Sequence, residues 1–450
     1  MDILALIPQF GGFIWTIAAF VLALSVIVAI HEYGHYIVGR WSGIHADVFS
    51  LGFGPVLYSR VDRRGTRWQI AALPFGGYVK FAGDANAASG RDDAAMAQAA
   101  NDPVRLRATM HGAPLWARTA TVAAGPLFNF ALSILVFAAV VLTSGVARDQ
   151  LAVGELRPLP VEQRGLEVGD EILRINGAVV PSTQDAQAYA DFIDAIPQEA
   201  ILEYTVRRDG SERRVADAYI LPPLVNGVSP QSPALSAGLE VGDVITAIDG
   251  APIFSFAELK VAVEGGNGAP LALTIWRAGD TLDVTLTPKR VDEPQPEGGF
   301  ATQWRIGIAG GLAFEAATQT PGVGEALMSG VRQTGRIIEG SLSGLGHMIT
   351  GAISTCNLSG PIGIAQTSGA MASQGAQSFI WFIAVLSTAV GLLNLFPVPA
   401  LDGGHLVFYA YEAVTGKPPS DKALRVLMTF GLATVLTLMV FALGNDLFCP

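Results

Sequence analysis

The sequence predicts a membrane protein built on four transmembrane helices, with a β-hairpin after the first helix and two β-rich domains between the second and the third. Three observations predict this class. Half of the 450 residues are hydrophobic and only 15% are charged, against about 25% in a soluble globular protein. The hydrophobic residues gather in four long stretches. The segment between the second and third stretches contains an internal repeat at an offset of 73 residues.

Four stretches are long and apolar enough to cross a bilayer. Residues 13–30 carry no charge, and a helix continued to residue 39 would rise about 40 Å, which exceeds a bilayer core of about 30 Å. The other three stretches are residues 119–147, 378–401 and 426–445. Because the N-terminus lacks basic residues and the first apolar run is long, we expect a retained span rather than a cleaved signal peptide.

The distribution of basic residues predicts the orientation, because lysine and arginine gather in cytoplasmic loops. Segment 41–115 contains eight of them, and the loop before the last span contains Lys417, Lys422 and Arg425. We therefore expect both loops on the cytoplasmic side, and both termini and residues 148–377 on the extracytoplasmic side. The four spans make membrane lipid an expected partner. The net charge of -11 leaves no basic surface for a polyanion, so nucleic acid is not an expected partner.

The segment outside the membrane contains two copies of one small domain. At an offset of 73 residues, GLEVGD at 165–170 falls on GLEVGD at 238–243, and Ile175 falls on Ile248. An ungapped match over a whole supersecondary unit favours duplication over shared turn chemistry. The motif resembles that of the PDZ domain, in which glycines make turns and an aspartate leads into an apolar strand. The sequence therefore predicts two PDZ-like, β-rich α+β domains.

Two further segments have recognisable patterns. Residues 48–80 alternate in hydropathy and are interrupted by glycine and proline, which favours the strands of a hairpin. Residues 322–351 repeat apolar side chains at helical spacing, which predicts an amphipathic helix at the membrane surface. Cys356 and Cys449 lack the spacing of a thiolate metal site, and we treat them as structural.

The first span ends in His31-Glu32-Tyr33-Gly34-His35. On a helix, positions i and i+4 share one face, so the two imidazoles converge on one metal ion. Glu32 stands beside them, where its carboxylate can take a proton from an attacking water. Ionisable side chains are costly within a span and usually functional, although histidines at a helix end near the interface are an alternative. The pattern predicts a zinc site with Glu32 as general base.

A catalytic zinc has three protein ligands, and Asp402 is the candidate for the third. It follows the third apolar stretch in the sequence N-L-F-P-V-P-A-L-D-G-G, where prolines break a helix and glycines allow close backbone approach. The first and third spans run in the same direction, so His31 and Asp402 are expected at similar depths near the cytoplasmic side. The alternative role of Asp402 is that of an interfacial residue that ends the span.

These residues resemble a known family, the site-2 intramembrane zinc metalloproteases, and within it the bacterial regulator-of-sigma-E protease branch. The resemblance extends over nearly the whole chain. It rests on H-E-Y-G-H, on G-F-G-P at 52–55, on G-G-Y-V-K at 76–80, and on A-G-P with Asn129 at the start of the second span. It continues through the PDZ-like repeats, G-P-I-G at 360–363 and N-x-x-P-x-P-x-L-D-G-G at 394–404.

The resemblance implies a zinc-dependent endopeptidase of the bacterial inner membrane. Such an enzyme hydrolyses a peptide bond within the transmembrane segment of a single-span protein that has already been trimmed outside the membrane. Anti-sigma factors are substrates of this type, and signal-peptide remnants are a further class. By this resemblance His31, His35 and Asp402 bind Zn²⁺, and Glu32 is the catalytic base and later the acid.

Two further contacts with the substrate are implied. The family's asparagine falls on Asn394, which would donate hydrogen bonds to the substrate backbone or to the developing oxyanion; a capping or helix-packing amide is the alternative. Segment 46–81 resembles a re-entrant β-hairpin whose edge pairs with an unwound substrate. The expected substrate-binding residues within it are Gly52, Phe53, Gly54 and Pro55.

Three questions stay open at this point. The PDZ-like pair either grips a substrate by β-augmentation or excludes untrimmed substrates by size. A catalytically idle scaffold would also carry such a pair, but a scaffold has no need for ionisable groups at membrane depth. A zinc transporter would need polar residues along a path through the bilayer, and the second and fourth spans have almost none.

The predicted organisation follows the order of these segments. The transmembrane spans occupy residues 1–40, 116–147, 378–402 and 426–446. The remaining segments are a cytoplasmic-side loop with the hairpin (41–115), the two PDZ-like domains (148–222 and 223–291), a linker with the surface helix (292–377) and a cytoplasmic loop (403–425).

Overall fold

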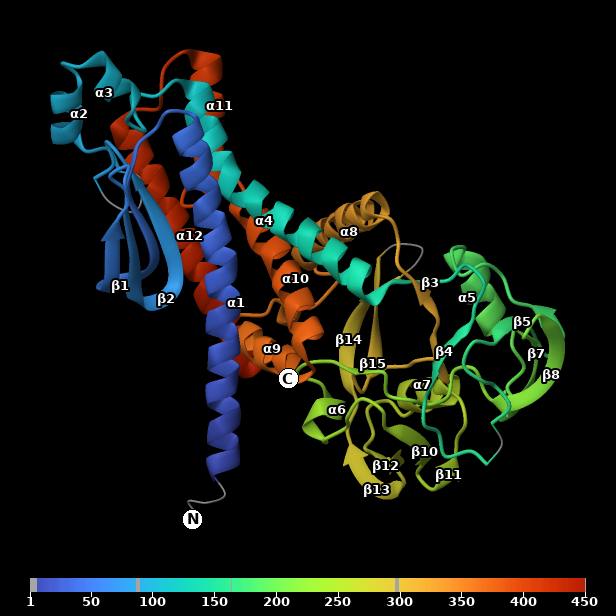
Figure 1. Ribbon diagram of the computed structural model, residues 1–450. Coiled ribbons are helices and arrows are strands. Elements are labelled where there is room, and N and C mark those ends of the chain that lie inside the picture. The colour runs from blue at the N-terminus through green and yellow to red at the C-terminus, as the bar shows by residue number, and fades with distance from the viewer. Residues whose placement is uncertain (1–5, 86–89, 163, 296–298, 450) are drawn as a thin grey trace. The chain divides into compact units, whose positions relative to one another are not determined.

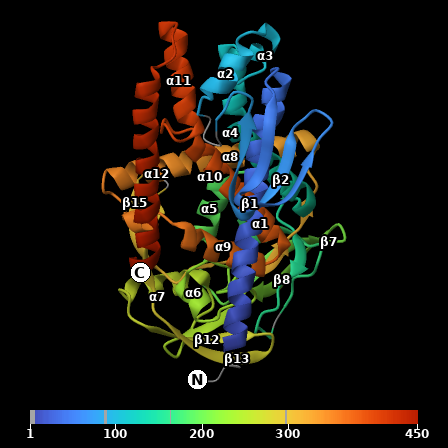
Figure 2. The same ribbon diagram turned by 90° about the vertical axis from the view of Figure 1, so that its left-hand side faces the viewer.

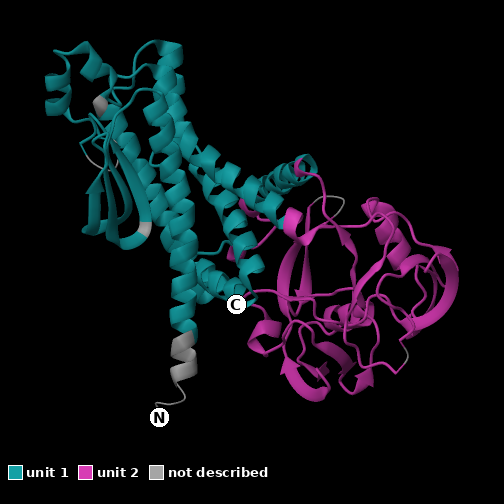
Figure 3. Cartoon of the chain, in the orientation of Figure 1, with its two compact units in different colours: residues 1–140, 324–346, 358–449 teal, residues 141–323, 347–357, 450 magenta. Residues whose placement is uncertain are grey.

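The structure, a computed structural model, describes residues 6–85, 90–162, 164–295 and 299–449. It divides into two compact units (Figure 3). Of the described residues, unit 1 contains those within 6–140, 324–346 and 358–449, and unit 2 contains those within 141–323 and 347–357. Unit 1 is mainly helical and unit 2 is rich in strands, so the predicted combination of membrane helices with a β-rich insertion is confirmed.

Unit 1 holds the helices that are long and apolar enough to cross a membrane. Among the described residues there are four such segments, Gly12–Trp41, Leu115–Ser144, Ala376–Asn394 and Lys422–Phe448, and they confirm the four predicted spans. The helices of this unit are α1 (Leu6–Trp41), α2 (Asp93–Ala99), α3 (Pro103–Arg107), α4 (Leu115–Ser144), α8 (Val323–Ile349), α9 (Pro361–Ser373), α10 (Ala376–Asn394), α11 (Asp402–Thr415) and α12 (Asp421–Phe448) (Figures 1 and 2).

The third span ends earlier than predicted, and the loop predicted at 403–425 is largely helical. Helix α10 ends at Asn394, and Asp402 is the first residue of α11 rather than the last residue of the span. The prolines between them end α10. Glycine then allows the tight return: a Cβ on Gly403 would lie 2.3 Å from the carbonyl oxygen of Phe396. The turn therefore brings Asp402 back to the end of α10.

The G-P-I-G motif begins α9 and is held by the last helix. Asp446 of α12 accepts hydrogen bonds from the backbone N–H groups of Gly360, Ile362 and Gly363 at 2.8, 2.9 and 3.1 Å. A helix N-terminus presents unpaired N–H groups and the positive end of the helix dipole, which a carboxylate satisfies. Asp446 thus ties α12 to α9, and α9 packs on α1 and α10.

The predicted amphipathic helix is present as α8. Its residues Ala326, Gly330 and Thr334 are buried and recur every four positions, which places them on one helical face. A Cβ on Gly330 would lie 2.4 Å from the carbonyl oxygen of Ile134 in α4, so the two helices cross in close contact. Its place at the membrane surface stays a prediction.

The loop after α1 forms the predicted hairpin, β1 (Ala46–Val61) and β2 (Arg67–Phe81). Both strands bend, so that residues 46–51 of β1 pair on one side with 77–81 and on the other with 67–70. Within the described ladder, residues 77–81 pair only with 46–51. They therefore form an edge of this small sheet.

Unit 2 contains the two predicted repeats. The sheet of the first has the strand order β6-β5-β7-β8, and that of the second has the matching order β11-β10-β12-β13. The elements are β3 (Val146–Ala147), β4 (Val153–Leu156), β5 (Glu171–Ile175), β6 (Ala178–Val179), α5 (Ala186–Asp194), β7 (Ile201–Arg208), β8 (Ser211–Ala218), β9 (Gly227–Val228), α6 (Pro233–Ser236), β10 (Val244–Ile248), β11 (Ala251–Pro252), α7 (Phe256–Gly265), β12 (Leu271–Arg277), β13 (Asp280–Leu286), β14 (Lys289–Pro294), β15 (Phe300–Arg305), β16 (Ile308–Ala309), β17 (Phe314–Ala316), β18 (Thr318–Gln319) and the 3₁₀ turn Thr355–Asn357. The apolar residues that match at the 73-residue offset form the two cores, Leu166, Ile172 and Ile175 in one and Leu239, Ile245 and Ile248 in the other.

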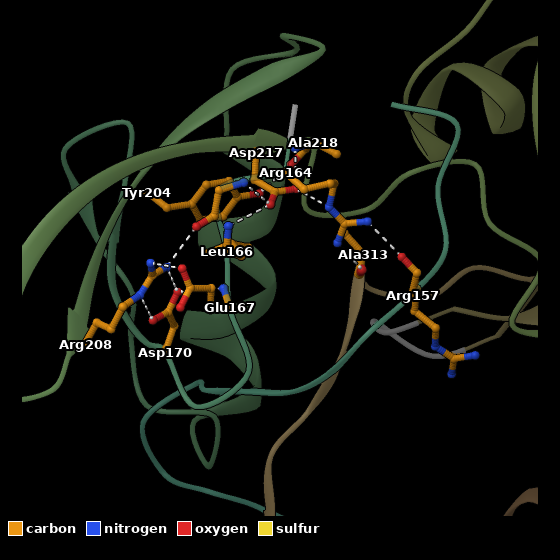
Figure 4. Close-up of polar contacts among 11 residues, drawn as sticks. Arg157, Arg164, Leu166, Glu167, Asp170, Tyr204, Arg208, Asp217, Ala218 and Ala313 are labelled. Atoms are coloured by element: carbon orange, nitrogen blue, oxygen red, sulfur yellow. Dashed lines mark hydrogen bonds and ion pairs between the residues drawn. The ribbon is translucent and has the colours of Figure 1, made fainter. Parts of the chain in front are cut away.

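An arginine clamp explains the acidic residues of the GLEVGD motif. In the first repeat Arg208, at the end of β7, donates to both carboxylate oxygens of Asp170 at 2.7 Å (Figure 4). It also donates to the carbonyl oxygen of Gly165 at 2.8 Å. Arg277 makes the same contacts with Asp243 and Gly238 in the second repeat. Burial acts to raise the pKa of Asp170, but these hydrogen bonds hold it below its ordinary value.

The segment after the second repeat is not the linker that we predict from residue 292. Residues 306–319, here called the strap, contain three short strands: β16 pairs with β9 of the second repeat, β17 with β4 of the first, and β18 with β3. Phe314 enters the core of the first repeat and Ile306 that of the second. The predicted boundary at residue 291 is wrong because the edges of β4 and β9 need backbone partners, and the strap supplies them. The strands of the strap are so short that their sequence resembles that of turns.

Candidate metal centre

Two glycines bring α1 and α4 into close contact at the histidines. A Cβ on Gly34 would lie 2.6 Å from the carbonyl oxygen of Ala124, and a Cβ on Gly125 would lie 2.3 Å from His35 Nε2 and 2.9 Å from His31 Cε1. Small residues allow membrane helices to approach backbone to backbone. The glycine inside H-E-Y-G-H and the glycine of A-G-P therefore form one helix crossing, and the imidazoles lie in it.

Three side chains converge at this crossing. His31 Nε2 and His35 Nε2 lie 3.1 Å apart, and Asp402 Oδ2 lies 3.1 Å from the first and 3.4 Å from the second. In the part of the chain that the structure describes, this is the group of three metal-ligating residues whose donor atoms all lie within 4.8 Å of one another. The structure thus brings together the two histidines of α1 and the aspartate that begins α11.

The geometry and chemistry of these atoms fit zinc. Tetrahedral zinc with ligand distances of about 2.0–2.2 Å holds its ligand atoms about 3.3–3.6 Å apart, close to the separations seen here. Asp402 Oδ2 is buried and has no hydrogen-bond partner among the described residues. Two imidazole nitrogens and a carboxylate oxygen leave a fourth tetrahedral position for water.

Residues of α4 contact the Nδ1 atoms of both imidazoles, on the side away from Asp402. His35 Nδ1 lies 2.9 Å from the backbone carbonyl oxygen of Thr121, and His31 Nδ1 lies 3.2 Å from the side-chain amide of Asn129. Such contacts to the far ring nitrogen fix the orientation and tautomer of a metal-binding histidine. Each Nε2 is thereby directed towards the other and towards Asp402.

Helix α11, which carries Asp402, is fixed to α4 by an ion pair. Arg118 of α4 donates two hydrogen bonds to the carboxylate of Glu412, at 2.6 and 3.0 Å, and its guanidinium lies 5.2 Å from the centre of the Tyr409 ring. A two-pronged arginine–carboxylate pair has a defined geometry. Contacts with α4 therefore position His31 and His35 of α1 and also the helix that carries Asp402.

A cavity of about 490 Å³ opens onto the three side chains. Glu32 and Asn394 line it, as does the edge of the hairpin at Gly77 and Tyr78. Asn394 donates its side-chain amide hydrogen to the carbonyl oxygen of Val390, one turn earlier in its own helix.

The predicted substrate-binding residues Gly52, Phe53, Gly54 and Pro55 do not line this cavity. Phe53 instead stacks on Tyr78, with ring centres 6.0 Å apart. The hairpin reaches the candidate centre through 77–81 of β2, where an added Cβ on Gly77 would lie 3.0 Å from Glu32 Cγ.

Residues 19–438 match peptidase family M50. The chain belongs to this family. This M50 chain is 36% identical over 437 residues to a protein of Agrobacterium fabrum named as a zinc metalloprotease, covering 96% of this chain and 95% of the relative. It is 32% identical to the Regulator of sigma-E protease RseP of Salmonella typhimurium, covering 96% and 98%.

The M50 chain is therefore a zinc metalloprotease, as the sequence motifs predict, and the four apolar helices among its described residues make it a membrane protein. Among solved structures, this chain is similar to a PDZ domain of HtrA3 bound to a phage-derived ligand, with 33% sequence identity. The match covers 15% of this chain and 62% of the PDZ-domain chain, with a TM-score of 0.14.

Sequence reasoning on this M50 protease missed several residues that shape the centre. Thr121 contributes only a backbone oxygen, which no side-chain pattern reveals. Gly125 and Asn129 were named in the sequence analysis only as part of the family motif. Their spacing of four residues places them on one face of α4. That spacing within a span was the signal that could have indicated a shared role near the histidines.

Proposed function

We propose that this zinc metalloprotease is an intramembrane endopeptidase that cleaves the transmembrane segment of single-span proteins already trimmed outside the membrane. One observation carries the proposal: His31 and His35 lie inside the apolar segment Gly12–Trp41, and Asp402 meets them there. Peptide-bond chemistry at that place acts on a substrate within the bilayer. The name of the Salmonella relative, a regulator of sigma-E protease, supports anti-sigma factors as the substrate type. Signal-peptide remnants, which the sequence resemblance implies, are a second proposed type.

His31, His35 and Asp402 would hold the zinc ion. When bound there, zinc would polarise the scissile carbonyl and make the attacking water a better nucleophile. Glu32, adjacent to His31 and on the cavity wall, takes the proton from that water and later delivers it to the leaving amine. Asn394, on the same wall, turns its amide from Val390 towards the substrate backbone or the developing oxyanion.

The substrate is held as an added strand. A helical peptide bond is shielded by its own hydrogen bonds, so the substrate must unwind, and an unwound segment in lipid needs backbone partners. Residues 77–81 of β2 are an edge and reach the cavity, which supports them as the pairing strand in place of 52–55. The glycine and proline residues at 52–55 then shape the bend of β1.

Loss of the third ligand tests the ligand set. Asp402→Ala in the purified full-length chain is expected to lower zinc content from about one per chain to near zero and to abolish cleavage of a trimmed, tagged single-span protein, because two histidines alone bind zinc weakly. Metal analysis and a gel-based cleavage assay measure both. The exposed Asp280→Ala in β13 is the matched control. A variant at position 402 that keeps zinc and cleaves normally would exclude this centre.

For orientation, we propose that both termini and unit 2 lie outside the cytoplasm. Cys356 in unit 2 and Cys449 after α12 are both disulfide-bonded, and disulfides persist in oxidising compartments such as the bacterial periplasm. The basic residues of 41–115 and 417–425 agree with this side assignment.

The two cysteines give the test of this orientation. In intact spheroplasts, an impermeant maleimide is expected to label them only after an impermeant reductant has been added. Labelling that requires lysis of the cells would reverse the orientation.

Unit 2 acts as a size filter rather than as a docking site. The strap pairs with both repeats, which supports one body that obstructs bulky domains. Arg148 N donates to Ala317 O at 3.0 Å, so the chain can be rejoined here with 151–316 removed. We expect this deletion to permit cleavage of untrimmed substrate at a rate near that of trimmed substrate. If both substrates are instead cleaved more slowly than by the parent, unit 2 is a docking site.

A further inference from the structure

Asn129 is fully buried in α4 and touches a proposed zinc ligand. Its relative exposure is 0%, and its Nδ2 lies 3.2 Å from His31 Nδ1. Its Oδ1 is buried and has no hydrogen-bond partner among the residues that the structure describes. Buried amide oxygens in proteins are nearly always hydrogen-bonded, so this orientation of the amide leaves an acceptor unsatisfied beside the metal centre.

The neighbouring histidine shows which atom of Asn129 belongs at that contact. His35 Nδ1 faces the carbonyl oxygen of Thr121, which can only accept a hydrogen bond. His35 therefore carries its proton on Nδ1 and presents the lone pair of Nε2 to the centre. His31 presents Nε2 to the same point. Its Nδ1 must then carry a proton as well, and that proton needs an acceptor.

The backbone of Asn129 is held firmly enough for this role. Its carbonyl oxygen accepts a hydrogen bond from the hydroxyl of Ser387 at 3.0 Å. The single hydroxyl hydrogen of Ser133 is shared between this oxygen at 3.0 Å and Ala384 O at 2.8 Å. These contacts join α4 to α10 at the level of His31. The side chain of Asn129 therefore starts from a fixed point.

We propose that Asn129 is a positioning residue for zinc, whose side-chain Oδ1 accepts the hydrogen bond of His31 Nδ1–H. The oxygen and nitrogen of an amide exchange places by rotation about one bond without changing its shape. The exchange gives His31 an acceptor and fixes the tautomer in which Nε2 is free to bind metal. The inference rests on the proposed function, since it assigns a partner to a proposed ligand.

The test measures zinc affinity in the full-length chain in detergent, by competition with a chromogenic chelator. Asn129→Leu removes the acceptor at similar size and is expected to raise the zinc Kd about 10–100-fold, the effect typical of lost outer contacts. Asn129→Asp keeps an oxygen acceptor and removes the donor, and it is expected to stay within about threefold of the parent. Leu135→Ala, at a side chain of the same helix that is 58% exposed, is the control with unchanged Kd.

The variants distinguish three roles of the Asn129 side chain: acceptor of a hydrogen bond from His31, donor of a hydrogen bond to His31, and packing without a hydrogen bond. If Asn129→Asp binds zinc as weakly as Asn129→Leu, the amide donates to His31 and the proposal is wrong. It is also wrong if Asn129→Leu keeps the parental Kd. Helix content by circular dichroism identifies a misfolded leucine variant, and Asn129→Ala then replaces it against the same aspartate variant. A parent chain that binds no zinc would overturn the proposed function itself, which is a different result from equal affinities.

Discussion

Glu32→Gln is expected to leave zinc bound at about one per chain and to lower the rate of cleavage about 10²–10⁴-fold, the contribution of a well-placed general base. The glutamine has the size of glutamate and lines the same cavity, but it cannot take a proton from the attacking water. The three proposed ligands, His31, His35 and Asp402, are untouched. Metal analysis of the purified variant and cleavage of a trimmed single-span substrate measure the two quantities separately.

The control for this experiment is Glu325→Gln, which removes a carboxylate at the exposed start of α8. It should cleave at the parental rate. Should Glu32→Gln cleave within about threefold of the parent, Glu32 is no general base. If zinc is lost as well, the carboxylate is part of the metal site rather than a proton carrier.

Gly125→Ala is expected to disrupt the centre without removing any ligand. The added Cβ would lie 2.3 Å from His35 Nε2 and 2.5 Å from its Cε1, where no carbon atom can fit. The ring or the helix must move by about an ångström, and a misplacement of that size costs about 100-fold in rate. We expect at least that loss in cleavage together with weaker zinc binding, measured by chelator competition.

From helix propensity alone, a Gly→Ala substitution inside a helix should stabilise the protein, and the control substitution tests this. An alanine is more favourable than a glycine inside a helix by about 1 kcal/mol. Gly444 of α12 has no atom within 4 Å of an added Cβ, so Gly444→Ala should keep full activity and unfold at the same or a higher temperature. If Gly125→Ala resembles it in activity and zinc binding, the close helix crossing is not needed.

Much of the fold could be predicted from the sequence because its signals are local. Uncharged stretches gave the four spans, and the 73-residue offset gave two repeats whose matching apolar residues form the two cores. The arginine clamp was missed because Arg208 and Arg277 are 69 residues apart, so an ungapped comparison at 73 does not align them. The strap was missed because strand pairing between distant segments has no local signal.

In the candidate centre, too, the features with a local sequence signal were predicted and those that depend on contacts between distant segments were not. H-E-x-x-H is local, since helical geometry alone places His31 and His35 on one face. The aspartate could be anticipated from the direction and depth of two spans, but its place at the start of α11 depends on a turn packed against α10. Asn129 could not be assigned a partner, because a contact between α1 and α4 depends on which glycines meet.

The strap makes the order of synthesis matter for folding. Val153 in β4 pairs with Ala316 in β17, which is about 160 residues later in the chain. At a synthesis rate of about 5–20 residues per second, β4 waits roughly 8–30 s for its partner. The first repeat is thus synthesised with an open strand edge and an unfilled place for Phe314. Pairings so distant in sequence also fold slowly. Chaperones therefore have a defined interval in which this edge needs protection from other chains.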